Sequence, residues 1–140
     1  MMDDPSMTLE SKLTVLAGEL KKIVDWKWDG RYRTALGEFA ASEKDRVLGV
    51  LETHLISSWD SLTVKDAPDV VRDIVKTLGG LMSGQLLLLS DSRQAACIFC
   101  AWWPWGSGSK ISIRIAPFSK TLESEDAEAL TAQLRSAFEI

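Results

Sequence analysis

The chain has 140 residues, of which 46% are hydrophobic and 26% are charged, and its formal net charge is −4. This length predicts one domain over residues 1–140 with a core large enough to fold without disulfides, and the composition excludes a disordered or fibrous protein. The acidic balance argues against a general affinity for nucleic-acid backbones or anionic membrane surfaces.

No apolar run reaches the roughly 18 residues that a membrane-spanning helix needs. The segment Met1-Met2-Asp3-Asp4-Pro5 is acidic and lacks the basic region and apolar run of a secretory signal. We therefore expect a cytoplasmic protein that has no membrane partner.

The first half of the chain predicts three helices. Apolar residues recur at three- and four-residue steps between Leu9 and Val24, again from Ser42 to Ile56, and again from Asp66 to Leu78, where Gly79 and Gly80 end the pattern. Residues 34 to 41 could add one or two helical turns before the second helix.

The stretch from Asp25 to Arg33 breaks the helical period. It concentrates three aromatic and three basic residues in nine positions: Trp26, Lys27, Trp28, Arg31, Tyr32 and Arg33. The interleaving of aromatic and basic side chains is the pattern that single-stranded nucleic-acid sites use, although the acidic chain disfavours that use.

Three strands are predicted in the second half, at Leu86 to Leu89, Ala95 to Trp103 and Lys110 to Ile115. The short polar connections favour an antiparallel meander with the second strand in its centre. The first two strands are apolar on both faces. The third alternates isoleucines with Lys110, Ser112 and Arg114, as a half-exposed strand does.

A last helix follows Pro117 and Phe118, with an apolar stripe made of Ala127, Leu130, Leu134, Ala137 and Phe138. The predicted fold class is therefore α+β, with three N-terminal helices, a three-stranded antiparallel meander and a C-terminal helix. Helices on one side would leave the second apolar face of the sheet in water. Either the chain's own helices cover that face or a second subunit or partner does, and we expect a subunit or partner, with Trp102 or Trp103 near the centre of the contact.

Signals for catalysis or cofactor binding are weak. Cys97 and Cys100 form a C-x-x-C string within an apolar strand, where residues three apart point to opposite faces, so we expect two buried, reduced thiols. His54, the only histidine, borders an apolar helical stripe, and no nucleophile elbow accompanies it. The Gly106-Ser107-Gly108 loop leads into a strand and predicts a hairpin turn instead of a phosphate site.

Acidic residues near helix starts are explained by the helix dipole. We therefore expect no metal, no cofactor and no enzymatic activity.

Tryptophan is the most informative residue type, with six copies in the chain. Because Trp, Tyr and Arg are over-represented at binding hot spots, the expected partner-binding residues are Trp26, Trp28, Tyr32, Trp102, Trp103 and Trp105. An alternative is that Trp102 and Trp103 each fill one side of the sheet and that Trp105 caps the hairpin.

The sequence thus favours a non-enzymatic, protein-binding module of the adaptor, chaperone-like or immunity-like kind, which binds a protein partner or itself as a homodimer through an aromatic sheet surface. One alternative is a small-molecule-binding domain or enzyme with a pocket near Trp59 and His54. A second alternative is a weak single-stranded nucleic-acid binder through residues Trp26 to Arg33.

Overall fold

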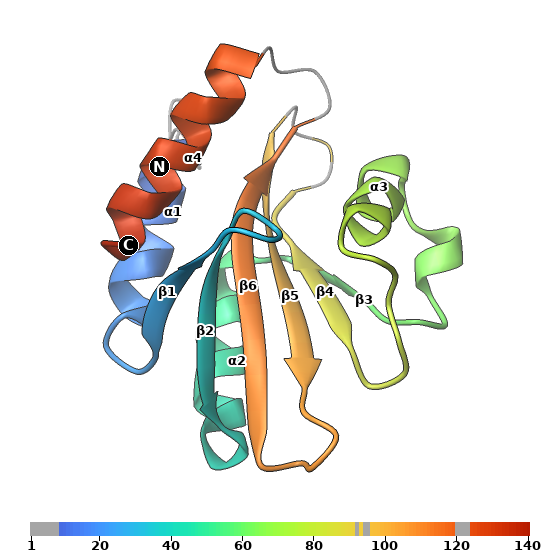
Figure 1. Cartoon of the computed structure of the whole chain (residues 1–140). Helices are drawn as coiled ribbons and strands as arrows, with labels where there is room; N and C mark the ends of the chain where they lie inside the picture. The colour runs from blue at the N-terminus through green and yellow to red at the C-terminus, as the bar shows by residue number, and fades with distance from the viewer. Residues whose placement is uncertain (1–8, 92, 94–95, 120–123) are drawn as a thin grey trace, which may run out of the picture.

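The computed structural model describes residues 9–91, 93, 96–119 and 124–140. Figure 1 shows how these residues are arranged. The described chain contains, in order, α1 (Leu9–Leu20), β1 (Asp25–Asp29), β2 (Thr34–Ala40), α2 (Lys44–His54), β3 (Ser57–Trp59), α3 (Asp69–Thr77), β4 (Leu86–Leu89), β5 (Cys97–Pro104), β6 (Lys110–Phe118) and α4 (Ser124–Phe138). Short 3-10 turns at Ala41–Glu43 and Val64–Asp66 precede α2 and α3.

All six strands form one antiparallel sheet in the order β1-β2-β6-β5-β4-β3. The fold is α+β, but the predicted arrangement of three N-terminal helices followed by a three-stranded meander is wrong. The three expected helices are present as α1, α2 and α3, and strands β1, β2 and β3 lie between them. The sheet is consequently twice as wide as predicted.

The meander of β4, β5 and β6 forms the predicted antiparallel pairs, with β5 between its two neighbours. Ala95, the predicted start of the second strand, lies outside the described residues. The additional strands extend the meander on both sides, because β2 pairs with β6 and β3 pairs with β4.

The missed strands lack strong local signals. In β1, Trp26 and Trp28 alternate with charged residues, but the alternation covers only five positions. In β2, the sequence Thr-Ala-Leu-Gly-Glu-Phe-Ala contains good helix formers, so local propensity favours a helix. Pairing with β1 on one side and β6 on the other decides the strand conformation, as tertiary context often does for such weak local preferences.

Helices α1, α2 and α4 cover one face of the sheet, which we call the helix-covered face (Figure 1). The register places Trp26, Ile113 and Trp102 in one row across β1, β6 and β5 on this face. The α1 side chains Leu13, Leu16 and Leu20 are fully buried in the same core. Burial of such apolar surface is the main term that stabilises the fold, at roughly 25 cal/mol per Å².

The second face is covered only in part, by α3 over β3 and β4 and by the β1–β2 hairpin (Figure 1). The register assigns Leu87, Leu89, Phe99 and Ala101 to this face, and all four are buried. The chain's own α3 and hairpin therefore cover the apolar residues that the sequence-based expectation assigns to a partner. What remains open on the second face is mainly the lower part of β1, β2, β6 and β5.

Gly37 allows Val24 and the ring of Trp26 to pack directly against β2. A Cβ atom at this position would lie 2.7 Å from Cγ1 of Val24 and 3.0 Å from Cζ3 of Trp26. Trp26 is also the cross-strand partner of Gly37, so its ring covers the glycine. Glycine is required here because the neighbouring ring occupies the space of a side chain.

Candidate partner-binding surface

Three of the six expected binding residues face the helices. Trp102 is 5% exposed and its ring centre lies 5.5 Å from that of Phe39. The ring of Trp26 packs on Phe138 of α4, with 4.4 Å between ring centres. The ring of Trp28 lies beneath the guanidinium group of Arg135, at 4.6 Å. These rings join the sheet to α4 and to the core, so they are structural in this arrangement.

The other three residues, Tyr32, Trp103 and Trp105, lie on or beside the second face. Tyr32 belongs to the β1–β2 hairpin, which folds over the sheet and brings its ring to 5.8 Å from that of Trp103 in an edge-to-face arrangement. Trp105 follows β5 and is 40% exposed. We call the surface formed by Tyr32, Trp103, Trp105, Lys110 and Arg114 the aromatic surface.

Arg114 contacts both Trp103 and Tyr32 at the centre of the aromatic surface. Its guanidinium carbon lies 4.4 Å from the ring centre of Trp103 and 5.3 Å from that of Tyr32. Its Nε donates a hydrogen bond of 2.8 Å to Oδ2 of Asp29, and both side chains are largely buried, at 16% and 12% exposure. Arg114 thereby fixes the two rings and the hairpin against one another.

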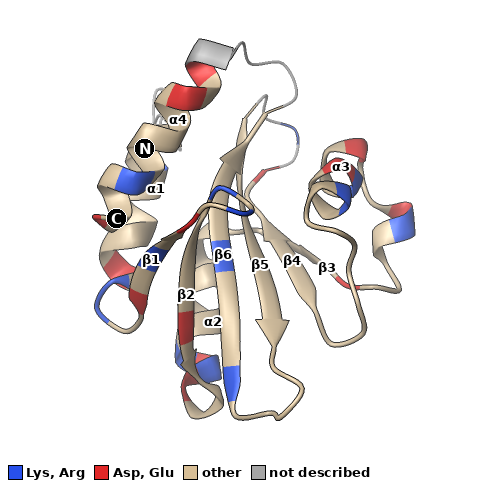
Figure 2. Ribbon diagram, viewed as in Figure 1, with Lys and Arg blue, Asp and Glu red and all other residues tan. Residues whose placement is uncertain are grey.

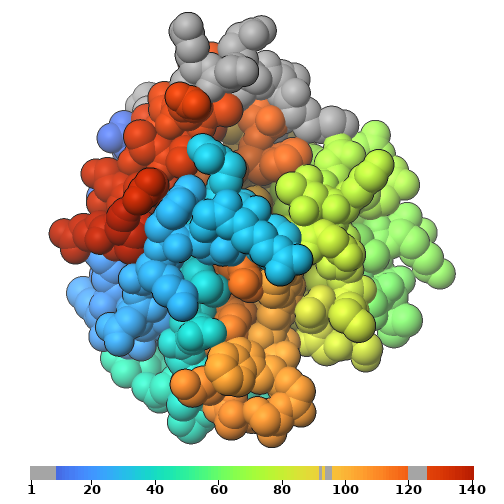
Figure 3. All heavy atoms as spheres, viewed as in Figure 1, coloured from blue at the N-terminus to red at the C-terminus, as the bar shows by residue number. Residues whose placement is uncertain are grey.

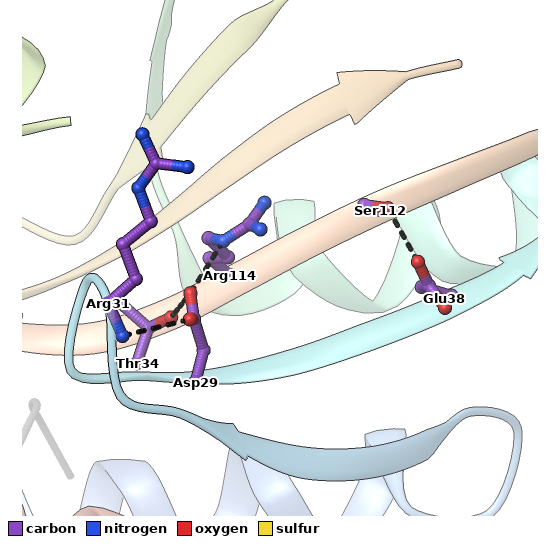
Figure 4. Close-up of polar contacts among 6 residues, drawn as sticks. All are labelled: Asp29, Arg31, Thr34, Glu38, Ser112 and Arg114. Carbon is purple, nitrogen blue, oxygen red and sulfur yellow. Dashed lines mark hydrogen bonds and ion pairs between the residues drawn. The ribbon is translucent and has the colours of Figure 1, made fainter. Parts of the chain in front are cut away.

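Asp29 connects this pair to the hairpin turn. The carboxylate accepts hydrogen bonds from the backbone N–H of Arg31 and from the hydroxyl of Thr34, as Figure 4 shows. Burial alone raises the pKa of Asp29, but the hydrogen bond and charge of Arg114, together with these two donors, outweigh burial. The pKa of the carboxyl group therefore lies below its usual value, and Asp29 stays ionised beside Arg114.

A second polar cluster orients Trp105. The indole Nε1 donates a hydrogen bond of 2.8 Å to Oγ of Ser112. The Ser112 hydroxyl in turn donates at 3.3 Å to Oε2 of Glu38, as Figure 4 shows. The ammonium group of Lys110 lies 5.3 Å from the ring centre of Trp105. Trp105 is therefore held in a defined orientation with much of its surface in solvent.

Figure 3 shows that this face of the molecule is an open, uneven surface without a deep central cleft. Two shallow cavities lie at its margins. One, of about 210 Å³, lies between Tyr32, Leu78, Phe99 and Leu130, and the other, of about 260 Å³, lies over Leu36 between Lys27 and Glu38. Both are smaller than the roughly 300–1,000 Å³ of ordinary small-molecule sites.

Exposed apolar side chains extend the surface at one end of the sheet. Leu62, Met82 and Trp105 are exposed and belong to the loops after β3, before β4 and after β5. The strand registers place these three loops at the same end of the sheet. Exposed apolar side chains beside fixed aromatic rings are typical of a protein interaction site.

His54 and Trp59 do not line either of these cavities. Nε2 of His54 pairs with Oε2 of Glu19, so His54 joins the end of α2 to α1. Trp59 lies in β3 opposite Leu87, on the second face. Neither cavity therefore forms a site that His54 and Trp59 share.

Cys97 and Cys100 are buried free thiols, as predicted. The register places Cys97 opposite Phe118 and Cys100 opposite Ile115, and these partners alternate along β6, so the two thiols point to opposite faces of the sheet. Burial raises the pKa of the Cys97 thiol to about 11 and raises that of Cys100 as well. Within the described ranges, no group of three His, Cys, Asp or Glu side chains could hold a metal ion.

Sequence reasoning missed Arg114 and Asp29 as members of the site. The alternation in β6 suggests that Lys110, Ser112 and Arg114 mark a solvent face, but only Lys110 is exposed; Ser112 is buried and Arg114 is mostly covered. An isolated arginine among isoleucines indicates a special environment, but nothing local indicates a partner 85 residues away.

No family model, no curated protein and no solved structure matches this chain. Among the described residues, no helix is both long enough and apolar enough to span a bilayer.

Proposed function

We propose that this protein is a non-enzymatic protein-binding module whose partner contacts the aromatic surface and the adjoining loop end of the sheet. The observation that carries the proposal is the fixed group of Trp103, Tyr32 and Arg114 beside the exposed ring of Trp105. Tryptophan, tyrosine and arginine are the residue types that most often form binding hot spots.

Preorganisation supports this function. Trp103, Ser112 and Arg114 belong to central strands, and the ion pair with Asp29 holds the hairpin over them. A partner that binds such a surface loses little free energy in ordering these side chains, because their positions are already fixed.

The two alternatives have less support. The described cavities are small and lie away from His54 and Trp59, which does not favour a small-molecule site near those residues. The rings of Trp26 and Trp28 pack toward α4, so a nucleic acid could not stack on them without displacing that helix. We further propose a cytoplasmic location, which suits the two free thiols.

The test compares partners recovered by three forms of the protein from an extract of the organism that produces it. The forms are the wild type, Trp105→Ala and the control Ile56→Ala, which removes an exposed apolar side chain from before β3, away from the loop end. We expect the wild type and the control to recover the same partner in equal amounts. Trp105→Ala should weaken its binding by about 2 kcal/mol, or roughly thirtyfold.

Thermal unfolding of both variants verifies that the fold is retained. Sedimentation of the purified protein shows whether the partner is a second copy, in which case Trp105→Ala should dissociate a homodimer. Equal recovery of every partner by all three forms, together with unchanged sedimentation, would contradict the proposal.

A further inference from the structure

The open part of the second face carries a small net positive charge, whereas the whole chain is acidic. The chain carries a net charge of −4. The strands and hairpin of the open part of the second face carry four basic and three acidic side chains, a net charge of +1: Lys27, Arg31, Lys110 and Arg114 against Asp25, Asp29 and Glu38. Arg33 is not counted, because its guanidinium carbon lies 6.0 Å from the ring centre of Trp28, which packs toward α4. Figure 2 shows the basic residues along β6 and at the tip of the hairpin.

The acidic side chains at the centre of this face already have partners. Asp29 pairs with Arg114, and Glu38 accepts the hydrogen bond from Ser112. Among the described residues, no carboxylate lies within ion-pair distance of Lys27, Arg31 or Lys110. Among the described residues of the open surface, three cations without an ion-pair partner, Lys27, Arg31 and Lys110, therefore stand against the two carboxylates of Asp25 and Glu38.

The free cations flank the aromatic rings. The guanidinium carbon of Arg31 lies 5.1 Å from the ring centre of Tyr32, at the Arg114 end of the surface, and Lys110 stacks on Trp105 at the other end. Arg31 and Lys110 therefore lie at opposite ends of the aromatic surface.

We propose that the aromatic surface binds an acidic segment of a partner protein, with carboxylates at Arg31 and Lys110 and an apolar side chain against Trp105. This inference rests on the proposed function and specifies the partner's chemistry. An acidic polypeptide complements the local positive charge and also supplies apolar side chains for the exposed Trp105, Met82 and Leu62.

A protein segment suits this surface better than a single-stranded nucleic acid. Arginine side chains already lie over the rings of Tyr32 and Trp103, where bases would have to stack.

The experiment measures binding of three probes to the immobilised full chain: a glutamate–tyrosine copolymer, a lysine–tyrosine copolymer and single-stranded oligothymidine. The test variant is Arg31→Glu/Lys110→Glu. The matched control is Lys44→Glu/Arg46→Glu, which makes the same charge change on exposed positions of α2. Thermal unfolding confirms that both double variants are folded.

The glutamate–tyrosine copolymer should bind the wild type and the control equally, and binding should weaken as salt increases. The test variant should bind at least about tenfold more weakly, because two attractive charge pairs become repulsive. Equal binding of the lysine–tyrosine copolymer, preference for oligothymidine, absence of copolymer binding, or an unchanged affinity of the test variant would overturn the inference.

Recovery of the natural partner by the two variants distinguishes failure of this inference from failure of the proposed function. If Trp105→Ala releases that partner and Arg31→Glu/Lys110→Glu does not, the binding surface stands and its acidic specificity is refuted. If neither variant releases it, the proposed function fails with the inference.

Discussion

The close packing at Gly37 gives a direct test of the strand arrangement that the sequence did not reveal. Replacing Gly37 with alanine adds one methyl group to β2 on the helix-covered face. That carbon would lie 2.7 Å from Cγ1 of Val24 and 3.0 and 3.1 Å from two ring carbons of Trp26. Carbon atoms are normally separated by about 3.5–4.0 Å, so both neighbours must move.

Neither neighbour can move freely. Val24 is 5% exposed within the core, and the Trp26 ring packs on Phe138 of α4. Overpacking of this kind typically costs about 1–3 kcal/mol. The reduced entropy of the unfolded alanine chain returns about 0.4–1 kcal/mol. We therefore expect a net loss of about 1–2 kcal/mol, equivalent to a melting temperature lower by roughly 3–8 °C.

Gly49→Ala is the matched control. Gly49 is exposed on α2, and apart from its chain neighbours and the nearby helix backbone nothing lies within 4 Å of a Cβ atom added there. Alanine is the better helix former by about 1 kcal/mol, so this variant should be more stable than the wild type. Urea unfolding, followed by tryptophan fluorescence and circular dichroism, gives both free energies.

A second substitution identifies the clash itself. In a Val24→Ala background the nearest obstructing atom is absent, so Gly37→Ala should cost less than it does in the wild type, and the difference is the coupling energy. If Gly37→Ala stabilises the protein as much as Gly49→Ala does, the pairing of β1 with β2 beneath α4 is refuted.

The remaining predictions concern the ion pair, the thiols and the histidine. Asp29→Asn should lower the unfolding free energy at neutral pH by about 1–3 kcal/mol, because Arg114 loses a charged acceptor in a mostly buried position. The pKa of Asp29 is lowered in the folded state, so the carboxylate's contribution is complete above its unfolded value of 3.8 and is lost as the pH falls through the folded value. Unfolding curves of Asp29→Asn and wild type should thus converge below about pH 3.8, and a constant difference at every pH would contradict this. Thiol labelling of Cys97 and Cys100 should be slow in the folded protein and fast in denaturant, because burial raises both pKa values; stoichiometric zinc in elemental analysis would argue against free thiols. His54→Gln should change stability by less than about 1 kcal/mol and leave partner recovery unchanged, because its contact with Glu19 is partly exposed. Loss of biological activity without a change in melting temperature would instead support a histidine-dependent reaction.

The amino-acid pattern alone determined the elements in which a helical repeat extends over many residues or in which a strand is strongly apolar. The three helices of the first half, the meander of β4 to β6 and the helix α4 follow from side chains that repeat at the spacing of one structure type. Within the predicted stripe of α4, Leu134 and Phe138 are buried, whereas Ala127 is exposed. The placement of Cys97 and Cys100 on opposite faces also follows directly, because alternation along a strand is a local property of the backbone.

Only the tertiary structure decided the other half of the sheet and the composition of the aromatic surface. Strand β2 has helix-favouring residues, and its conformation depends on hydrogen bonds to β1 and β6. Local sequence could name the aromatic residues but could not sort Trp26, Trp28 and Trp102 from Trp103 and Trp105, because that division depends on which face α4 covers.

The central ion pair shows the same limit most clearly. Asp29 and Arg114 are ordinary charged residues in their local sequences, and neither is expected to be buried. They meet because β1 and β6 both pair with β2, one on each side, and because the hairpin turns back over the second face. A contact between residues so far apart in the chain is created by strand order, which no short stretch of sequence encodes.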